Sequence, residues 1–204
     1  MAKRYPSDIA PFAAVSDDSI EAGAALRALV PADAPVILFA PAPVAAPEGL
    51  EATVLGSMHQ MVATRTLEPS PVDVNVLPLG ATDVPDMQRL TTLTRPGPFG
   101  PRTYLLGRYI GIRVAGQLVA MAGERLRLSG HTEISAVCVH PEHRRKGYAQ
   151  VLIADLVHHL GRRGITPFLH VISDNRSAIA LYEQLQFKTR RRLYATALTH
   201  SSSR

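Results

Sequence analysis

Three adjacent cations stand in the stretch HRRKGYAQVLI, residues 143–153, which runs directly into an apolar helix pattern. Arg144, Arg145 and Lys146 repel one another, and Gly147 is a poor helix residue, so the arrangement is costly unless an anion lies beside it. The start of a helix offers free backbone N–H groups and the positive end of its dipole, and glycine lets the backbone approach a phosphate. The stretch therefore predicts a diphosphate site at a helix N-terminus.

Two wider patterns surround this site, although the motifs G-x-x-x-x-G-K-[ST] and G-x-G-x-x-G are both absent. The first is V-x-P followed by Q/R-x-x-G-x-G/A, matched by Val139, Pro141, Arg144, Gly147 and Ala149. The second is N-x-x-A-x-x-L-Y-x-x-x-x-F, matched by Asn175, Ala178, Leu181, Tyr182 and Phe187. On these residues the chain resembles the GNAT superfamily of acyl-CoA-dependent N-acetyltransferases, clearly over about residues 100–198.

The resemblance implies a mixed α/β (α+β) fold with a mostly antiparallel sheet flanked by helices. Two central strands would splay apart, namely the strand that ends at Val139 and the strand PFLHVIS. Acetyl-CoA, the acyl donor, would lie in the gap between them. Strand residues would bind the pantetheine arm, and Asn175 would contact the cofactor near its reactive end. The implied cofactor-binding residues besides Asn175 are Val137, Cys138, Val139, Arg144, Arg145, Lys146, Gly147, Tyr148 and Ala149.

Three residues are candidates for the chemistry of transfer to a primary amine. The resemblance implies that Tyr182 gives a proton to the leaving CoA thiolate, whereas its alternative role is to pack into the core. His170 lies twelve residues before the tyrosine, where the branch that acetylates protein N-termini carries a base. Glu133 is the rival base, and by strand alternation it shares a face with Val137 if no bulge intervenes.

Other reactive residue types are expected to be structural. Cys138 has no activating partner in the motifs, so we expect a small buried thiol and direct transfer without an acyl-enzyme. The four histidines between residues 140 and 159 form no H-E-x-x-H motif, so no metal is expected. The basic run at 190–192 lacks interleaved aromatic residues, so no nucleic-acid partner is expected.

Charge is unevenly spread over the 204 residues, whose net charge is +5. Residues 141–204 hold 11 Lys and Arg against 4 Asp and Glu, which gives +7, whereas residues 1–140 hold 11 against 13, which gives −2. The C-terminal positive field favours an anionic ligand, with a solvated basic surface as the alternative. One cysteine and the absence of a long apolar stretch predict a cytoplasmic protein that neither spans nor binds a membrane.

The element pattern predicts two parts joined by a proline-rich linker at residues 68–73. Residues 1–71 are expected to form an N-terminal α/β extension of unknown role, and residues 72–204 the GNAT-like domain. Within the extension we expect a helix near 17–29, a strand near 36–40, and a second strand at 51–55 followed by a short helix.

In the second part, two strands are expected to turn at Ala115–Gly116, and GYAQVLIADLVHHLGRRG is expected to be an amphipathic helix. The sequence does not identify the amine, and homodimer formation is left open. A non-catalytic CoA-binding sensor and a basic nucleic-acid-binding module are the alternative functions.

Overall fold

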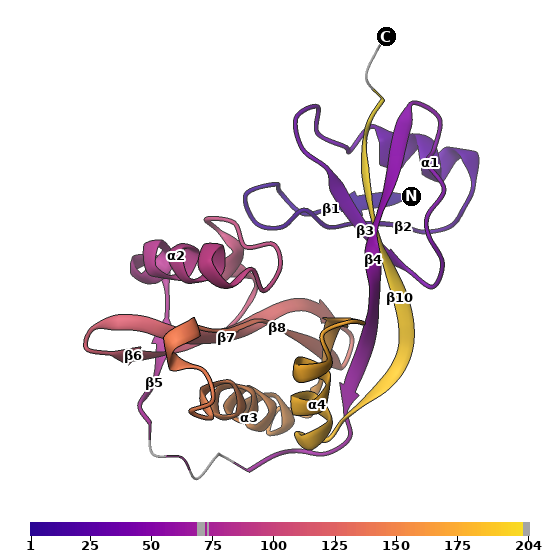
Figure 1. Ribbon diagram of the computed structural model, residues 1–204. Helices are drawn as coiled ribbons and strands as arrows, with labels where there is room; N and C mark the ends of the chain where they lie inside the picture. Colours follow the sequence, from indigo (N-terminus) through magenta and orange to yellow (C-terminus); the bar gives the residue numbers. More distant parts are fainter. Residues whose placement is uncertain (69–71, 73, 202–204) are drawn as a thin grey trace.

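The computed structural model describes residues 1–68, 72 and 74–201, and its centre is one eight-stranded sheet (Figure 1). The strand order is β3-β10-β4-β9-β8-β7-β6-β5, and every neighbouring pair is antiparallel except β8 and β9. This confirms the predicted mixed, mostly antiparallel sheet. The strands are β3 (Val36–Ala40), β4 (Leu50–Ala63), β5 (Val76–Leu79), β6 (Tyr109–Val114), β7 (Gln117–Leu128), β8 (His131–Val139), β9 (Thr166–Ile172) and β10 (Phe187–His200).

Helices cover both faces of the sheet (Figure 1). On one face lie α3 (Tyr148–Gly161) and α4 (Arg176–Gln184), and on the other lies α2 (Val84–Thr94). The inward stripe of α3 includes Leu152 and Leu156, which are fully buried in the largest apolar cluster, as the predicted amphipathic pattern requires. No helix within the described ranges is long and apolar enough to cross a membrane.

The N-terminal segment forms a small lobe at the far end of β3, β4 and β10 (Figure 1). It contains β1 (Ala2–Arg4), β2 (Ala13–Val15) and α1 (Ile20–Arg27), and α1 is the helix expected near residues 17–29. Leu26 of α1 packs with residues of β3, β4 and β10. The segment therefore contributes strands to the same sheet as the motif-bearing residues.

β4 corrects the prediction of a strand at 51–55 followed by a short helix. It is a single strand of 14 residues that pairs with β10 along its whole length. Cross-strand pairing with a segment more than a hundred residues away outweighs the local sequence pattern here. Most of the linker expected at 68–73 lies outside the described residues.

The hairpin between β6 and β7 turns at Ala115–Gly116, which confirms the predicted turn. Both residues are left-handed, with φ of 48° at Ala115 and 81° at Gly116. A two-residue hairpin loop needs this geometry to match the twist of its strands. The loop therefore sets the register in which β6 and β7 enter the sheet.

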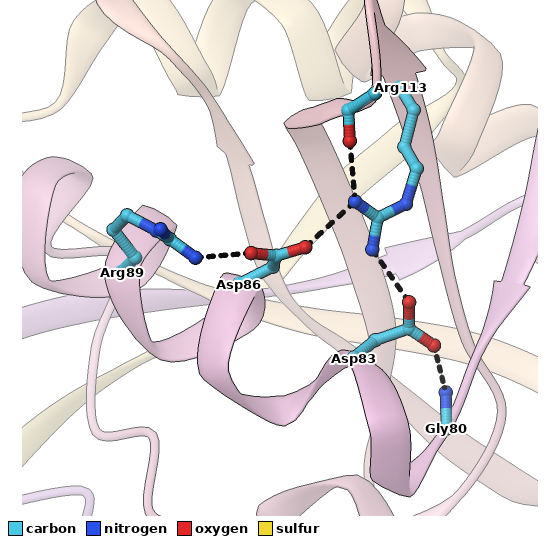
Figure 2. Close-up of polar contacts among 6 residues, drawn as sticks. Gly80, Asp83, Asp86, Arg89 and Arg113 are labelled. Carbon is cyan, nitrogen blue, oxygen red and sulfur yellow. Dashed lines mark hydrogen bonds and ion pairs between the residues drawn. The ribbon is translucent and has the colours of Figure 1, made fainter.

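The start of α2 is tied to β6 by a branched ion pair (Figure 2). Arg113 donates to Asp86 at 2.7 Å and to Asp83 at 2.6 Å, and Asp86 also pairs with Arg89. Asp83 is the N-cap residue of α2, and its second oxygen accepts from the backbone N–H of Gly80 at 3.0 Å. The network holds α2 against the sheet face that carries the predicted base residues.

Candidate active site

A cleft of about 720 Å³ opens between β8 and β9. The two strands pair only over residues 131–133 and 166–168 and then separate, which confirms the predicted splay. The cleft brings together most of the residues that the motifs singled out. The expected site residues that line it are Val137, Cys138, Val139, Arg144, Arg145, Gly147, Tyr148, Ala149, His170, Asn175 and Tyr182. Lys146 and Glu133 do not line it; Lys146 instead lies beside His143.

A bulge in β8 decides which side chains share a face. Ala136 has φ of 52°, and the register with β7 shifts at this point. A bulge reverses the alternation of side chains beyond it. Val137 consequently packs against the same apolar cluster as Ile134, so Glu133 and Val137 lie on opposite faces. The shared face was expected only for a strand without a bulge, and that condition is not met.

The free edge of β8 presents backbone groups to the cleft. The N–H of His140 donates to Val119 of β7 at 2.7 Å. Because successive residues of an antiparallel strand direct their backbone groups to opposite sides, those of Val139 and Val137 point away from β7 and toward the cleft. An extended ligand could therefore pair with this edge as an added strand would.

The loop before α3 is left-handed at two positions, with φ of 61° at Arg145 and 78° at Gly147. Gly147 is the N-cap of α3, so no side chain caps the first turn. The N–H groups of that turn have no partners within the helix, and residues of the turn line the cleft. The loop therefore combines unsatisfied donors with the charges of Arg144 and Arg145, which suits an anion.

Glu133 is fully buried and carries an ion pair on both oxygens. Arg125 donates to it through Nε at 2.8 Å and Nη2 at 2.6 Å, and Nδ1 of His170 lies 2.8 Å from its Oε1. Burial by itself raises the pKa of Glu133, but the charge of Arg125 and the hydrogen bonds from His170 and Arg125 lower it to about 2. The carboxylate is thus held ionised and in contact with His170.

This ion pair predicts a pH-dependent contribution to stability. Because the pKa of Glu133 falls from 4.5 to about 2 on folding, the contribution is present above pH 4.5 and is lost as pH falls toward 2. The shift corresponds to roughly 3 kcal/mol of unfolding free energy. Glu133→Gln should therefore be destabilised by about that amount at pH 7, measured by urea unfolding. The difference in unfolding free energy between the variant and the unsubstituted protein should become smaller below pH 4.5. A difference that stays constant from pH 7 to pH 2 would contradict a stabilising role of the ionised carboxylate.

His170 lies in an aromatic environment that motif reasoning missed. Its ring centroid is 5.1 Å from that of Phe39 in β3 and 5.6 Å from that of Phe168 in β9. Phe39 packs on Phe12 at 5.2 Å, and the guanidinium of Arg125 lies over Phe12 at 4.6 Å. Phe12 and Phe39 belong to the N-terminal segment and to no motif, so only the fold reveals them.

The N-terminal loop that leads to Phe12 is anchored on the segment after α2. Asp8 pairs with Arg102 at 3.0 Å, and Thr103 donates to the backbone oxygen of Ile9. A Cβ added at Gly100 would lie 2.6 Å from the backbone oxygen of Asp8, so the two segments touch closely. The segment near residue 100 therefore fixes the position of the loop that leads to Phe12.

Tyr182 and Asn175 both reach the cleft from α4. Tyr182 is only 9% exposed, and burial raises its pKa to about 12, so its hydroxyl stays protonated at neutral pH. Asn175 accepts from the N–H of Ala178 at 3.2 Å and so caps the start of α4. The cap leaves the Asn175 side chain at the cleft wall.

Cys138 behaves as a buried thiol. Burial raises its pKa to about 11, against smaller opposing effects of hydrogen bonds from Thr94 and Met121. The nucleophilic thiolate is therefore scarce at neutral pH. In the described part of the chain, no group of three or more His, Cys, Asp and Glu residues could hold a metal ion.

Comparisons with known proteins agree with this geometry. The family model described as FR47-like protein matches residues 109–195. The [ribosomal protein bS18]-alanine N-acetyltransferase of Escherichia coli K12 is 30% identical over 127 residues, which is 58% of this chain and 85% of that protein. A solved structure from Novosphingobium aromaticivorans, described as an acetyltransferase from the GNAT family, superposes with a TM-score of 0.88 at 38% identity. The match covers 98% of this chain and 89% of that one.

Proposed function

Because the chain belongs to the GNAT family of N-acetyltransferases, we propose that the cleft between β8 and β9 binds acetyl-CoA. Tyr182 and His170 would then assist the transfer of the acetyl group to a primary amine. One observation carries the proposal. Tyr182, which is protonated and can donate a hydrogen bond, and His170 line the same cleft as the loop before α3, which suits an anion. A CoA-binding sensor would need no such pair.

The loop and the strand edge would hold acetyl-CoA as the acyl-donor substrate. N–H groups of the first turn of α3, with Arg144 and Arg145, suit the diphosphate, and the backbone of Val137 and Val139 suits the amides of the pantetheine arm. Lys146, which does not line the cleft, would contribute its charge at longer range.

The transfer itself requires two proton movements. The amine nitrogen bonds to the acetyl carbon, the C–S bond breaks, the amine gives up one proton, and the thiolate gains one. We assign the first proton to Nε2 of His170 and the second to the hydroxyl of Tyr182. Glu133 supports His170 through Nδ1 rather than acting as the base, because it does not line the cleft and both of its oxygens are already bonded.

The diphosphate cradle yields a direct prediction. Gly147→Glu would place a negative charge and a side chain at a position with φ of 78°, where the backbone must approach the phosphates. Charge-assisted hydrogen bonds are worth roughly 1.5–3 kcal/mol each, so losing several should weaken CoA binding by about a hundredfold or more. Calorimetric titration of CoA into the folded variant measures this.

Gly147→Ala is the matched control, because it carries the same backbone penalty without the charge. A smaller loss of affinity is expected for it. CoA affinity that is unchanged in a folded Gly147→Glu variant would remove the loop from the binding site.

The activity is tested by measuring thiol release from acetyl-CoA with a panel of amines. The bS18-alanine relatives act on an alanine of a ribosomal protein, as their names say, so the panel should include peptide α-amines beside lysine side chains and small primary amines. Acceptor-dependent thiol release, with an acetylated product by mass spectrometry, is the expected result. CoA binding without turnover on any amine would favour the sensor.

A further inference from the structure

One row of side chains crosses five neighbouring strands through His170. In sheet order, the row contains Arg190 of β10, Gln60 of β4, His170 of β9, Glu133 of β8 and Arg125 of β7. Arg190 Nη1 lies 2.8 Å from Gln60 Oε1, and Gln60 Nε2 lies 3.2 Å from Nε2 of His170. The imidazole is thus contacted on both ring nitrogens, by Glu133 on one side and by Gln60 on the other.

The chemistry of the two ends sets the direction of every hydrogen bond in this row. Arginine has only donors, so the Gln60 atom that faces Arg190 must be its carbonyl oxygen, and the amide NH₂ must face His170. An ionised carboxylate only accepts, so Nδ1 of His170 must carry a hydrogen toward Glu133. Nε2 then accepts a hydrogen bond from the Gln60 amide. A proton on Nε2 would face the amide hydrogens of Gln60 and is therefore disfavoured.

Glu133 and Gln60 therefore act on His170 in opposite directions. The negative charge of Glu133 favours the doubly protonated imidazolium, whereas a donor aimed at Nε2 favours the neutral ring. The other groups packed on the ring, Phe39 and Phe168, are apolar. The charged groups near it are Glu133 in direct contact, Arg125 behind Glu133, and Arg190 behind Gln60.

We propose that Gln60, oriented by Arg190, is a positioning residue that keeps a proton off Nε2 of His170 and so holds this histidine neutral. Its role in turnover rests on the proposed function, in which His170 is the base. The acceptor amine then donates an N–H to the same lone pair that the Gln60 amide occupies in the free enzyme.

The first test changes the group that faces Nε2. Gln60→Glu keeps an oxygen for Arg190 but offers His170 an acceptor with a negative charge, which favours the imidazolium. The His170 ring titration, followed by NMR of histidine-labelled protein and assigned by its loss in His170→Gln, should move to higher pH by about 1–3 units. The acidic limb of the kcat/KM profile should move with it. Gln117→Glu, the same charge change on the exposed end of a hairpin, should move neither.

The second test leaves Gln60 in place. Arg190 is exposed, so Arg190→Ala should fold, and it frees the Gln60 amide to turn its oxygen toward His170. The ring titration should again move upward, by less than in Gln60→Glu, and Arg190→Lys should restore it because lysine is also only a donor.

The outcomes separate this inference from the proposed function. A ring titration that is unchanged in Arg190→Ala, or a neutral His170 that carries its proton on Nε2 in the unsubstituted protein, overturns the inference. If the ring titration moves while the acidic limb stays, the contact acts as proposed and His170 is not the base, so the proposed function fails instead.

Discussion

Replacing Tyr182 with phenylalanine is expected to lower kcat by about 10²–10⁴-fold, the usual contribution of a positioned acid, with little change in CoA affinity. The hydroxyl is protonated throughout the working range because burial raises the pKa of Tyr182 to about 12. The thiol of CoA should have a pKa like that of cysteine, near 8.5, so complete proton transfer from this tyrosine to the leaving thiolate is uphill by roughly 5 kcal/mol. Tyr182 should therefore act through a hydrogen bond that strengthens as the C–S bond breaks.

The measurement is single-turnover thiol release under conditions in which chemistry limits the rate, together with calorimetric binding of CoA. Tyr194→Phe is a suitable control, because Tyr194 lies in β10 and does not line the cleft. It should keep the kcat of the unsubstituted enzyme. A Tyr182→Phe enzyme with undiminished kcat would remove the tyrosine from the mechanism.

His170→Gln is expected to lower kcat/KM by a similar factor, about 10²–10⁴-fold, and to abolish the acidic limb of the pH–rate profile. The glutamine can still contact Glu133 but cannot take a proton from the amine. Glu133→Gln should slow the reaction and keep an acidic limb, because His170 remains at the cleft. His131→Gln, an exposed histidine at the start of β8, serves as the control and should change neither rate nor profile.

The opposite pair of results would reverse the assignment. If Glu133→Gln loses the acidic limb and His170→Gln retains it, Glu133 is the base. The size of the His170→Gln effect should also depend on the acceptor. A lysine-like amine with a pKa near 10.4 is neutral in only about one molecule in a thousand at pH 7, whereas an α-amine with a pKa near 7.8 is over a tenth neutral. The loss of kcat/KM should therefore be larger with the lysine-like amine.

The parts of the candidate site that depend on contiguous residues could be predicted from short patterns in the sequence. The cationic loop with Gly147 and the Asn175–Tyr182 pattern each place several groups through one short piece of backbone. The local geometry of each piece depends little on the rest of the fold. This holds for a left-handed glycine at the start of a helix, such as Gly147, and for Tyr182, which lies seven residues after Asn175. The turn at Ala115–Gly116 was predictable for the same reason.

The proposed division of roles between His170 and Glu133 depends on the tertiary structure. The sequence left both as bases, because each occupies a strand position whose facing depends on register. The bulge at Ala136 and the partners supplied by other strands, Arg125 to Glu133 and Gln60 to His170, give the two side chains different surroundings. β4 is one long strand because β10 pairs with it, and Phe39 reaches His170 because β3 adds to the edge of β10. Such contacts join segments far apart in the chain, so no local pattern of residues encodes them.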